Sequence, residues 1–208
     1  MKRKLIFATG NQGKLREIRM ILSDLDCQIL SLKDAGISQE IIEDGVTFEE
    51  NALIKAKTIM KLTNMIVLAD DSGLEIDALN KEPGVYSARF LGESTPYSIK
   101  NNYILEKMKD IPQEDRTARF VCVVACALPN GKVITKEGIM EGYIGYESKG
   151  NNGFGYDPIF WLPKYNCSSA ELTMEEKNKE SHRGKALDAI KVELKKIFNQ
   201  RIIDKDME

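Results

Sequence analysis

Apolar residues in the N-terminal part of the chain follow a strand pattern and then a helix pattern. Residues 4–8 form an apolar run that predicts a buried strand, and the polar, glycine-containing segment 9–13 interrupts it. The next apolar positions recur at helical spacing, at Leu15, Ile18, Ile21 and Leu22. Residues 27–32 predict a second strand, and the acidic segment 41–45 predicts a loop. The pattern therefore predicts a strand–helix–strand unit at the start of the chain.

A capping pattern marks the start of the next helix. Thr47 can cap its first turn, and Glu50, three residues on, is the matching capping-box residue. The apolar positions of this helix are Ala52, Ala56, Ile59 and Met60. Residues 66–69 then predict a strand that ends on 70–73, and residues 74–79 predict a short strand of their own.

The C-terminal half contains the strongest β pattern of the chain. Residues 97–108 predict a helix, and residues 119–128 predict a long buried strand. Pro-Asn-Gly at 129–131 predicts a hairpin turn that leads into a further strand from Val133. The glycine-rich segment 138–155 leaves its strand content open.

The end of the chain predicts one more helix and completes the fold class. Ser181 can cap this helix. Its apolar face consists of Ala186, Leu187, Ile190, Leu194 and Ile197. Strands that alternate with helices early, and an antiparallel hairpin late, predict an α/β fold with a mixed sheet flanked by helices. We expect residues 1–208 to form one domain, with a polar tail from about 202 to 208 that frays.

Composition and charge exclude several classes of protein. The 208 residues include 30 basic and 32 acidic side chains, and the net charge of −2 gives no electrostatic reason to bind duplex DNA or an anionic membrane. A single histidine excludes zinc sites that need two or three. Apolar runs are too short for a signal peptide or a membrane span. Four cysteines without a CxxC pair predict a reduced, cytoplasmic protein.

The first candidate for chemistry is the turn between the first strand and helix. It consists of Thr9, Gly10, Asn11, Gln12, Gly13 and Lys14. Backbone N–H groups and the dipole at a helix start attract anions, and Lys14 adds a full charge. The alternative is an ordinary turn with a solvated lysine. A Walker A loop is excluded, because only two residues separate Gly10 from Gly13 and Leu15 stands at the magnesium-binding position.

Two acidic segments form the second candidate. Asp70 and Asp71 follow an apolar strand, where ligands of open α/β sheets collect, and carboxylates there can hold Mg²⁺ or accept a proton from water. Glu43 precedes the helix that carries Asn51 and Lys55 on one face, a combination that suits a magnesium–triphosphate. The alternatives are a turn stabilised by Asx hydrogen bonds and a solvated charged face.

Two later segments could recognise a planar ligand. In the segment 153–158, glycines flank Phe154, so backbone can approach a ring while the phenylalanine stacks on it, and Asp157 could accept hydrogen bonds from ring N–H groups. His182 and Arg183, at a predicted helix start, can donate to carbonyl or phosphate oxygens. The alternatives are a structural turn and an incidental histidine. No GxSxG motif accompanies the histidine, which argues against a serine hydrolase.

These motifs, in this order, resemble the inosine triphosphate pyrophosphatase family, the pyrophosphatases of non-standard purine nucleoside triphosphates. The resemblance extends from Ala8 to about Leu187. Five blocks carry it, namely residues 8–14, 47–52, 69–74, 153–160 and 181–187, and residues 83–89 also match. Each block is weak alone, and the five together in order are specific.

The resemblance implies a fold, a reaction and a site. The fold would be a mixed α/β fold of two lobes around a cleft, usually a homodimer. The reaction would be hydrolysis of the α–β phosphoanhydride of ITP, dITP or XTP to the monophosphate and pyrophosphate. Glu43 and Asp71 would surround Mg²⁺, with Asp71 as proton acceptor and Ser72 touching substrate. The triphosphate would bind Thr9, Gly10, Asn11, Gln12, Gly13, Lys14 and Lys55, and the base Phe154, Gly155, Tyr156, Asp157, Lys177, His182 and Arg183.

Selectivity would follow from hydrogen-bond donors that face the purine 6-position. Inosine and xanthine present an oxo acceptor there, whereas adenine presents an amino donor that leaves His182 and Arg183 unmatched. Arg183 at a helix start also suits a phosphate, so both roles stay open. Two other functions compete: a pyrophosphatase for other modified nucleotides, pyrimidine ones included, and a nucleotide-binding regulator without catalysis. The choice between Asp70 and Asp71 as the base and the number of metal ions also stay open.

Overall fold

One mixed sheet runs through the described part of the chain. The computed structural model describes residues 3–205, with side chains described up to residue 199. The sheet order is β2-β1-β3-β4-β5-β6-β7. The strands are β1 (Arg3–Phe7), β2 (Cys27–Ser31), β3 (Ile66–Ile76), β4 (Thr117–Ala127), β5 (Val133–Ile144), β6 (Phe160–Leu162) and β7 (Cys167–Ser168). β1 is parallel to β2 and β3, and the pairs from β3 onward are antiparallel.

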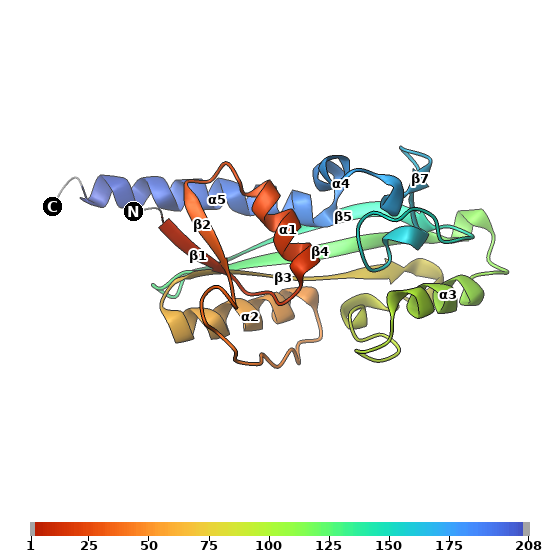
Figure 1. Ribbon diagram of the computed structural model, residues 1–208, viewed down its shortest axis with the longest axis horizontal. Coiled ribbons are helices and arrows are strands. Elements are labelled where there is room, and N and C mark those ends of the chain that lie inside the picture. Colours follow the sequence, from red (N-terminus) through yellow and green to blue (C-terminus); the bar gives the residue numbers. More distant parts are fainter. Residues whose placement is uncertain (1–2, 206–208) are drawn as a thin grey trace.

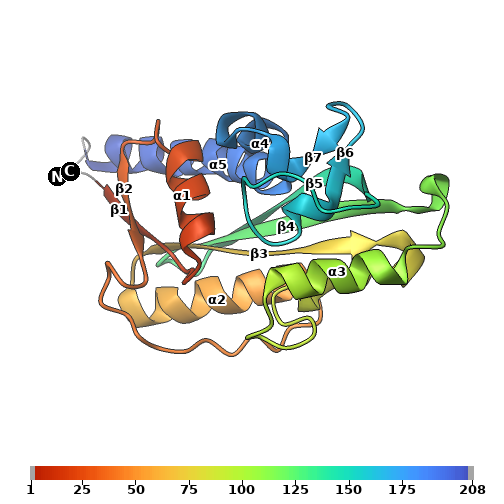
Figure 2. The same ribbon diagram turned by 45° about the vertical axis from the view of Figure 1, so that its right-hand side comes forward.

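Helices cover both faces of this sheet (Figure 1). They are α1 (Gln12–Ile21), α2 (Phe48–Thr63), α3 (Tyr97–Lys107), α4 (Met174–Glu180) and α5 (His182–Lys205). α1, α4 and α5 lie on one face, and α2 and α3 lie on the other, at opposite ends of the long strands (Figures 1 and 2). The predicted α/β class with a mixed sheet flanked by helices is therefore confirmed.

Three groups of buried apolar residues hold the layers together. One group packs α1 and α5 against the sheet, and its members include Ile18, Leu187, Ile190 and Leu194 from the predicted helix faces. A second packs α2 against the opposite face through Ala52, Ala56 and Ile59. The third lies at the far end of β3, β4 and β5, beneath α3 and β6. The long strands β3, β4 and β5 therefore connect the two groups that pack α1, α5 and α2 at one end of the sheet with the third group at the other end.

The strand predicted to end at Asp70 does not end there. β3 continues to Ile76, and the segment 70–73 is strand rather than turn. The reason is tertiary: β4 pairs with β3 residue by residue from Val67 to Ile76. On its other edge, β3 pairs with β1 only as far as Leu68. Beyond that point β1 turns into α1, so one edge of β3 is left for the pocket described below.

The predicted caps and hairpin are found with one difference. Thr47 accepts from the Glu50 backbone N–H at 3.1 Å, but the Glu50 carboxylate accepts from Val46 at 2.7 Å, so the capping box is not closed on Thr47. Ser181 Oγ accepts from the Gly184 N–H at 2.9 Å and caps α5. The hairpin turn joins β4 to β5, which extends to Ile144 and accounts for part of the glycine-rich segment.

The sequence pattern missed α4, a seven-residue helix with its own capping box at Thr173 and Glu176. It is too short to display helical periodicity. At the C-terminus α5 continues to Lys205, and residues 206–208 of the expected frayed tail lie outside the described residues. No helix within the described chain has the length and apolar character needed to cross a bilayer.

Candidate functional site

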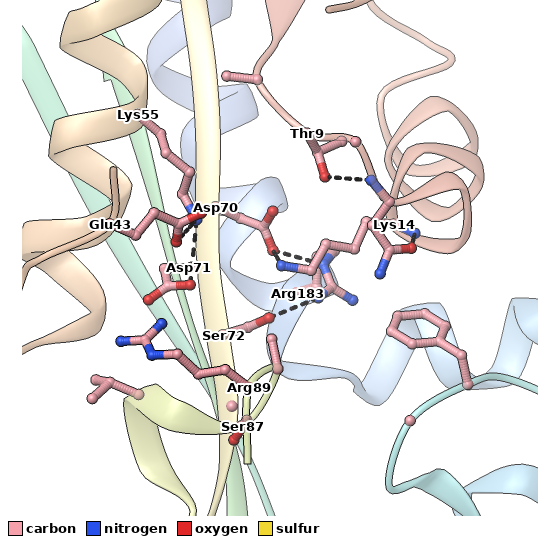
Figure 3. A pocket seen from close by; sticks show the side chains of 18 of the residues that line it. Thr9, Lys14, Glu43, Lys55, Asp70, Asp71, Ser72, Ser87, Arg89 and Arg183 are labelled. Atoms are coloured by element: carbon pink, nitrogen blue, oxygen red, sulfur yellow. Dashed lines mark hydrogen bonds and ion pairs between the residues drawn. The ribbon is translucent and has the colours of Figure 1, made fainter. Parts of the chain in front are cut away.

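A pocket of about 720 Å³ opens beside the free edge of β3 (Figure 3). It brings together segments that are far apart in sequence: the turn before α1, the loop before α2, α2 itself, β3, and the 153–157 and 177–183 regions. Most of the predicted site residues line it, namely Thr9, Gly10, Asn11, Lys14, Glu43, Lys55, Asp71, Ser72, Phe154, Gly155, Tyr156, Asp157, Lys177, His182 and Arg183. Gln12 and Gly13 do not line it; they form the first turn of α1.

The turn before α1 is organised by its own side chains. Asn11 caps the helix, and its Oδ1 accepts from the backbone N–H groups of Gly13 at 2.8 Å and Lys14 at 3.1 Å. Thr9 Oγ1 accepts from the Asn11 N–H at 3.1 Å. Three of the N–H groups that the sequence offered to an anion are thus already bonded within the turn. Lys14 adds a positive charge beside the turn, where its ammonium group pairs with Asp70.

Alternation along β3 sends neighbouring carboxylates to opposite sides of the sheet. Asp70 and Ser72 face α1 and α5, whereas Asp71 faces α2. On the first side, Asp70 Oδ2 lies 3.0 Å from Lys14 Nζ and 3.1 Å from Arg183 Nε. Burial opposes ionisation of Asp70, but Lys14, Arg183 and Lys55 outweigh it and hold the pKa of Asp70 well below its usual range.

Arg183 is the centre of a buried network on that side. Its Nε donates to Asp70, its Nη1 to Glu17 Oε2 at 2.5 Å and its Nη2 to Ser72 Oγ at 2.9 Å. Glu17 also lies 3.3 Å from Lys177 Nζ. A guanidinium has five N–H donors, so one on each terminal nitrogen is left for a ligand.

The opposite side of β3 carries a second ionic group. Lys55 Nζ lies 2.7 Å from Glu43 Oε2 and 3.3 Å from Asp71 Oδ1. Asn51 Nδ2 donates to Asp71 Oδ2 at 3.1 Å, so the predicted shared face of Asn51 and Lys55 is confirmed. Burial raises the pKa of Asp71 above its usual value, with Lys55 and Lys14 acting in the opposite direction.

Glu43 and Asp71 fit a magnesium ion as donors. Both carboxylates contact the same ammonium group, so they are close enough to share one cation. Mg²⁺ takes one or two protein carboxylates and completes its shell with phosphate oxygens and waters. Among the residues that the structure describes, no group of three or more His, Cys, Asp or Glu side chains is arranged for a metal. Two carboxylates match the number that Mg²⁺ takes from a protein when phosphate oxygens and waters complete its shell.

The 153–157 loop is shaped by Asp157. This buried carboxylate accepts from the Phe154 N–H at 2.8 Å and from Lys177 Nζ at 2.6 Å through Oδ2, and from Ser169 Oγ at 3.1 Å through Oδ1. Gly153 has a φ of 74°, and a Cβ there would lie 2.2 Å from Asp157 Oδ2, so only glycine fits. Asp157 is thus occupied with holding the loop that presents Phe154.

Phe154 lies next to cations and to the start of α1. Lys177 Nζ is 4.9 Å from the ring centroid, and a Cβ on Gly13 would be 3.0 Å from the ring. His182 is 5% exposed and stacks on Phe120, with centroids 4.9 Å apart. Burial and then the charges of Arg183 and Lys177 lower the pKa of His182 well below its usual value, so the ring is neutral at neutral pH. Its Nδ1 is buried without a hydrogen-bond partner.

Sequence reasoning missed several residues of this site. Glu17 is buried and bridges Arg183 and Lys177. In the sequence, the one feature that could have indicated this role is that a carboxylate stands between the apolar positions Leu15 and Ile18 of α1. Ser87 and Arg89 line the pocket from the segment after the 3-10 helix Gly84–Tyr86. Their segment matched the family resemblance, but nothing in its pattern indicated a role.

Comparison with known proteins identifies the family. The sequence profile of the Ham1 family matches residues 5–193. A protein named dITP/XTP pyrophosphatase from Exiguobacterium sibiricum is 49% identical over 191 residues, which are 92% of this chain and 96% of that protein. One of the same name from Desulforamulus reducens is 50% identical over 184 residues, 88% of this chain and 92% of that protein.

Solved structures agree with the sequence comparison. A HAM1 protein from Coxiella burnetii superposes with a TM-score of 0.85 at 39% identity, over 93% of this chain and 99% of that one. The Ham1 protein of Staphylococcus aureus gives a TM-score of 0.83 at 37% identity, over 93% and 98% of the two chains. Fold, length and sequence agree over almost the whole molecule, and the chain belongs to the Ham1 family.

Proposed function

We propose that this protein hydrolyses the α–β phosphoanhydride of non-standard purine nucleoside triphosphates, ITP, dITP and XTP, to the monophosphate and pyrophosphate. The observation that carries the proposal is the 49–50% identity, over nine-tenths of the chain, to proteins named dITP/XTP pyrophosphatase. The pocket supports it, because carboxylates and lysines for a metal–triphosphate lie beside an aromatic side chain and donors for a base. Removal of non-standard triphosphates would cleanse the nucleotide pool.

Charge neutralisation is the main task of such a site, since phosphoryl-type transfer needs positioning and electrostatic stabilisation more than a covalent nucleophile. Lys14 and Lys55 provide positive charge on the two sides of β3. Glu43 and Asp71 would hold Mg²⁺, which when bound neutralises phosphate charge and orients the oxygens. The turn that Thr9 and Asn11 organise would place the triphosphate against Lys14.

Asp71 suits the role of proton acceptor better than Asp70. Asp70 is 1% exposed, and its Oδ2 is held by Lys14 and Arg183, so it serves to fix those two cations. Asp71 is 8% exposed on the side where Glu43 lies. A carboxylate in that position can orient the attacking water and take its proton.

Base recognition would use Phe154 for stacking and His182 with Arg183 for hydrogen bonding. The unpartnered Nδ1 of His182 and the two remaining N–H donors of Arg183 are groups that a 6-oxo purine could satisfy. An adenine amino group would leave donors unmatched, and an unmet buried polar group costs about 1–3 kcal/mol.

The two competing functions have less support. A pyrophosphatase for pyrimidine or other modified nucleotides would not need the large aromatic and donor end formed by Phe154, His182 and Arg183. A regulator without catalysis would not need Glu43 and Asp71 facing one lysine beside the pocket.

Pyrophosphate, and not orthophosphate, should be released from ITP and XTP when Mg²⁺ is present. Identification of the phosphate product by ion chromatography, over a panel of purine and pyrimidine triphosphates with and without Mg²⁺, tests the reaction, the metal and the substrate class together. Stepwise release of orthophosphate would mean that another bond is cleaved. Equal rates on pyrimidine nucleotides would favour the first competing function, and binding without any turnover would favour the second.

Lys14→Ala and Lys55→Ala should each weaken triphosphate binding by about tenfold or more, with little change in the choice of base. Both lysines act on phosphate, which every nucleoside triphosphate shares. The measurement is KM for ITP together with the ratio of kcat/KM for ITP and ATP. Lys57→Ala is the matched control, because Lys57 is exposed on α2 two residues from Lys55. A large change in the ITP-to-ATP ratio would contradict the assignment to phosphate.

We also propose that the protein acts in the cytoplasm as a homodimer, as the family resemblance implies. Large apolar side chains are exposed, among them Ile42, Val46, Tyr86, Leu91 and Ile99. Contact with a second copy would cover such side chains.

A further inference from the structure

Arg89 differs from the other basic residues that line the pocket. The others, Lys14, Lys55, Lys177 and Arg183, each lie within 3.3 Å of at least one carboxylate oxygen. Within the described part of the chain, Arg89 has no carboxylate partner. Its guanidinium lies over the Tyr86 ring, with 4.8 Å between Cζ and the ring centroid. The pocket therefore contains one half-buried cation whose charge is not neutralised by the protein.

Buried donors from two other elements hold the backbone just before Arg89. The Tyr156 hydroxyl donates to the Ser87 carbonyl at 2.8 Å, and Lys100 Nζ donates to the Ala88 carbonyl at 2.7 Å. Lys100 is only 1% exposed. Ser87 Oγ in turn donates to the Gly84 carbonyl and accepts from the Leu74 N–H of β3. Arg89 thus projects from a fixed segment rather than from a free loop.

The position of Arg89 separates it from the base end of the pocket. Figure 3 shows its guanidinium on the same side of β3 as Asp71 and Glu43, away from Lys14. Phe154, by contrast, lies on the α1 side, against Gly13. A nucleotide whose base stacks on Phe154 would cross β3 with its phosphates, and the end farthest from the base would approach Arg89.

We propose that Arg89 binds the terminal phosphates of the triphosphate, the part that leaves as pyrophosphate. This assignment rests on the proposed function. A guanidinium matches phosphate oxygens with two parallel N–H donors and keeps its charge at any physiological pH. Because the other cations are already paired, Arg89 supplies positive charge that the protein leaves for the ligand. The Tyr86 ring supports the guanidinium without competing for its hydrogen bonds.

The test measures binding and needs no turnover. Isothermal titration calorimetry with Mg²⁺ gives Kd for inorganic pyrophosphate and for inosine monophosphate in the wild type, Arg89→Ala, Arg89→Lys and Arg16→Ala. Arg16→Ala is the matched control, since Arg16 is exposed on α1 outside the pocket lining and its removal changes the net charge equally. Arg89→Ala should raise Kd for pyrophosphate about tenfold or more and Kd for the monophosphate less than about twofold. Arg89→Lys should recover part of the loss, because it restores charge without the paired donors.

Three results would overturn the assignment. They are no binding of pyrophosphate to the wild type, an unchanged Kd for pyrophosphate in Arg89→Ala, and equal weakening of both ligands. Thermal unfolding of each variant separates lost contact from lost fold, and Arg89→Gln replaces Arg89→Ala if the latter unfolds. Failure of the proposed function looks different: the wild type would release no pyrophosphate from ITP, while the effect of Arg89 on pyrophosphate binding would persist.

Discussion

Asp71→Asn should reduce kcat for ITP by roughly two orders of magnitude or more, the scale of general acid–base catalysis. Asparagine keeps the shape of the side chain and can still pair with Asn51, but it cannot accept a proton from water or carry charge to a metal. The fold should survive, because Asp71 lies at the pocket edge of β3 and not in an apolar core. Steady-state rates of pyrophosphate release, with the unfolding midpoint measured in parallel, provide the test.

Two other aspartates make this prediction sharper. Asp44→Asn removes the exposed carboxylate that follows Glu43 in the sequence and should leave kcat unchanged. Asp70→Asn removes the partner of Lys14 and Arg183, and should lower stability as well as activity, because two cations lose a buried counter-charge. If Asp71→Asn kept the wild-type kcat while Asp70→Asn abolished it without loss of stability, Asp70 would be the base.

Arg183→Ala should reduce kcat/KM for ITP much more than for ATP, and so narrow the ratio between them. Donors aimed at one ring position distinguish an acceptor from a donor there, and such discrimination can be large. Phe154→Ala should instead lower both values by similar factors, because every purine offers a face for stacking, worth about 1–3 kcal/mol per base. The measurement is kcat/KM for ITP and ATP at saturating Mg²⁺ in each variant.

The buried network sets a control for this experiment. Without Arg183, Glu17 and Asp70 each lose one cationic partner and keep Lys177 and Lys14, respectively, so the free energy of unfolding should fall by roughly 3 kcal/mol. Activity must therefore be compared at a temperature where the variant is folded. Equal losses on ITP and ATP in the folded variant would assign Arg183 to phosphate rather than to the base.

Local patterns in the sequence predicted most of the elements. Apolar spacing located α1, α2, α3 and α5, and the β-rich run with its Pro-Asn-Gly turn located the β4–β5 hairpin, because helix and strand periodicities depend on neighbours within a few residues. The end of β3 could not be predicted in this way. Its extension to Ile76 depends on pairing with β4, which is about fifty residues away in sequence.

The sequence by itself determined the fold class, most of the helices and strands, and the motif residues that line the pocket, since these depend on local periodicity and on residue type. The tertiary structure alone decided how those residues are divided. Alternation along β3 places Asp70 with Lys14 and Arg183, and Asp71 with Lys55 and Glu43. The tertiary structure also adds two residues to the site. Glu17 pairs with Arg183, which is distant in sequence, and Arg89 lines the pocket beside residues from other segments. The charged side chains form one site only because the edge of β3, α1, α2 and α5 surround the same pocket. The packing of these elements depends on contacts between distant segments, so a local sequence pattern cannot predict it.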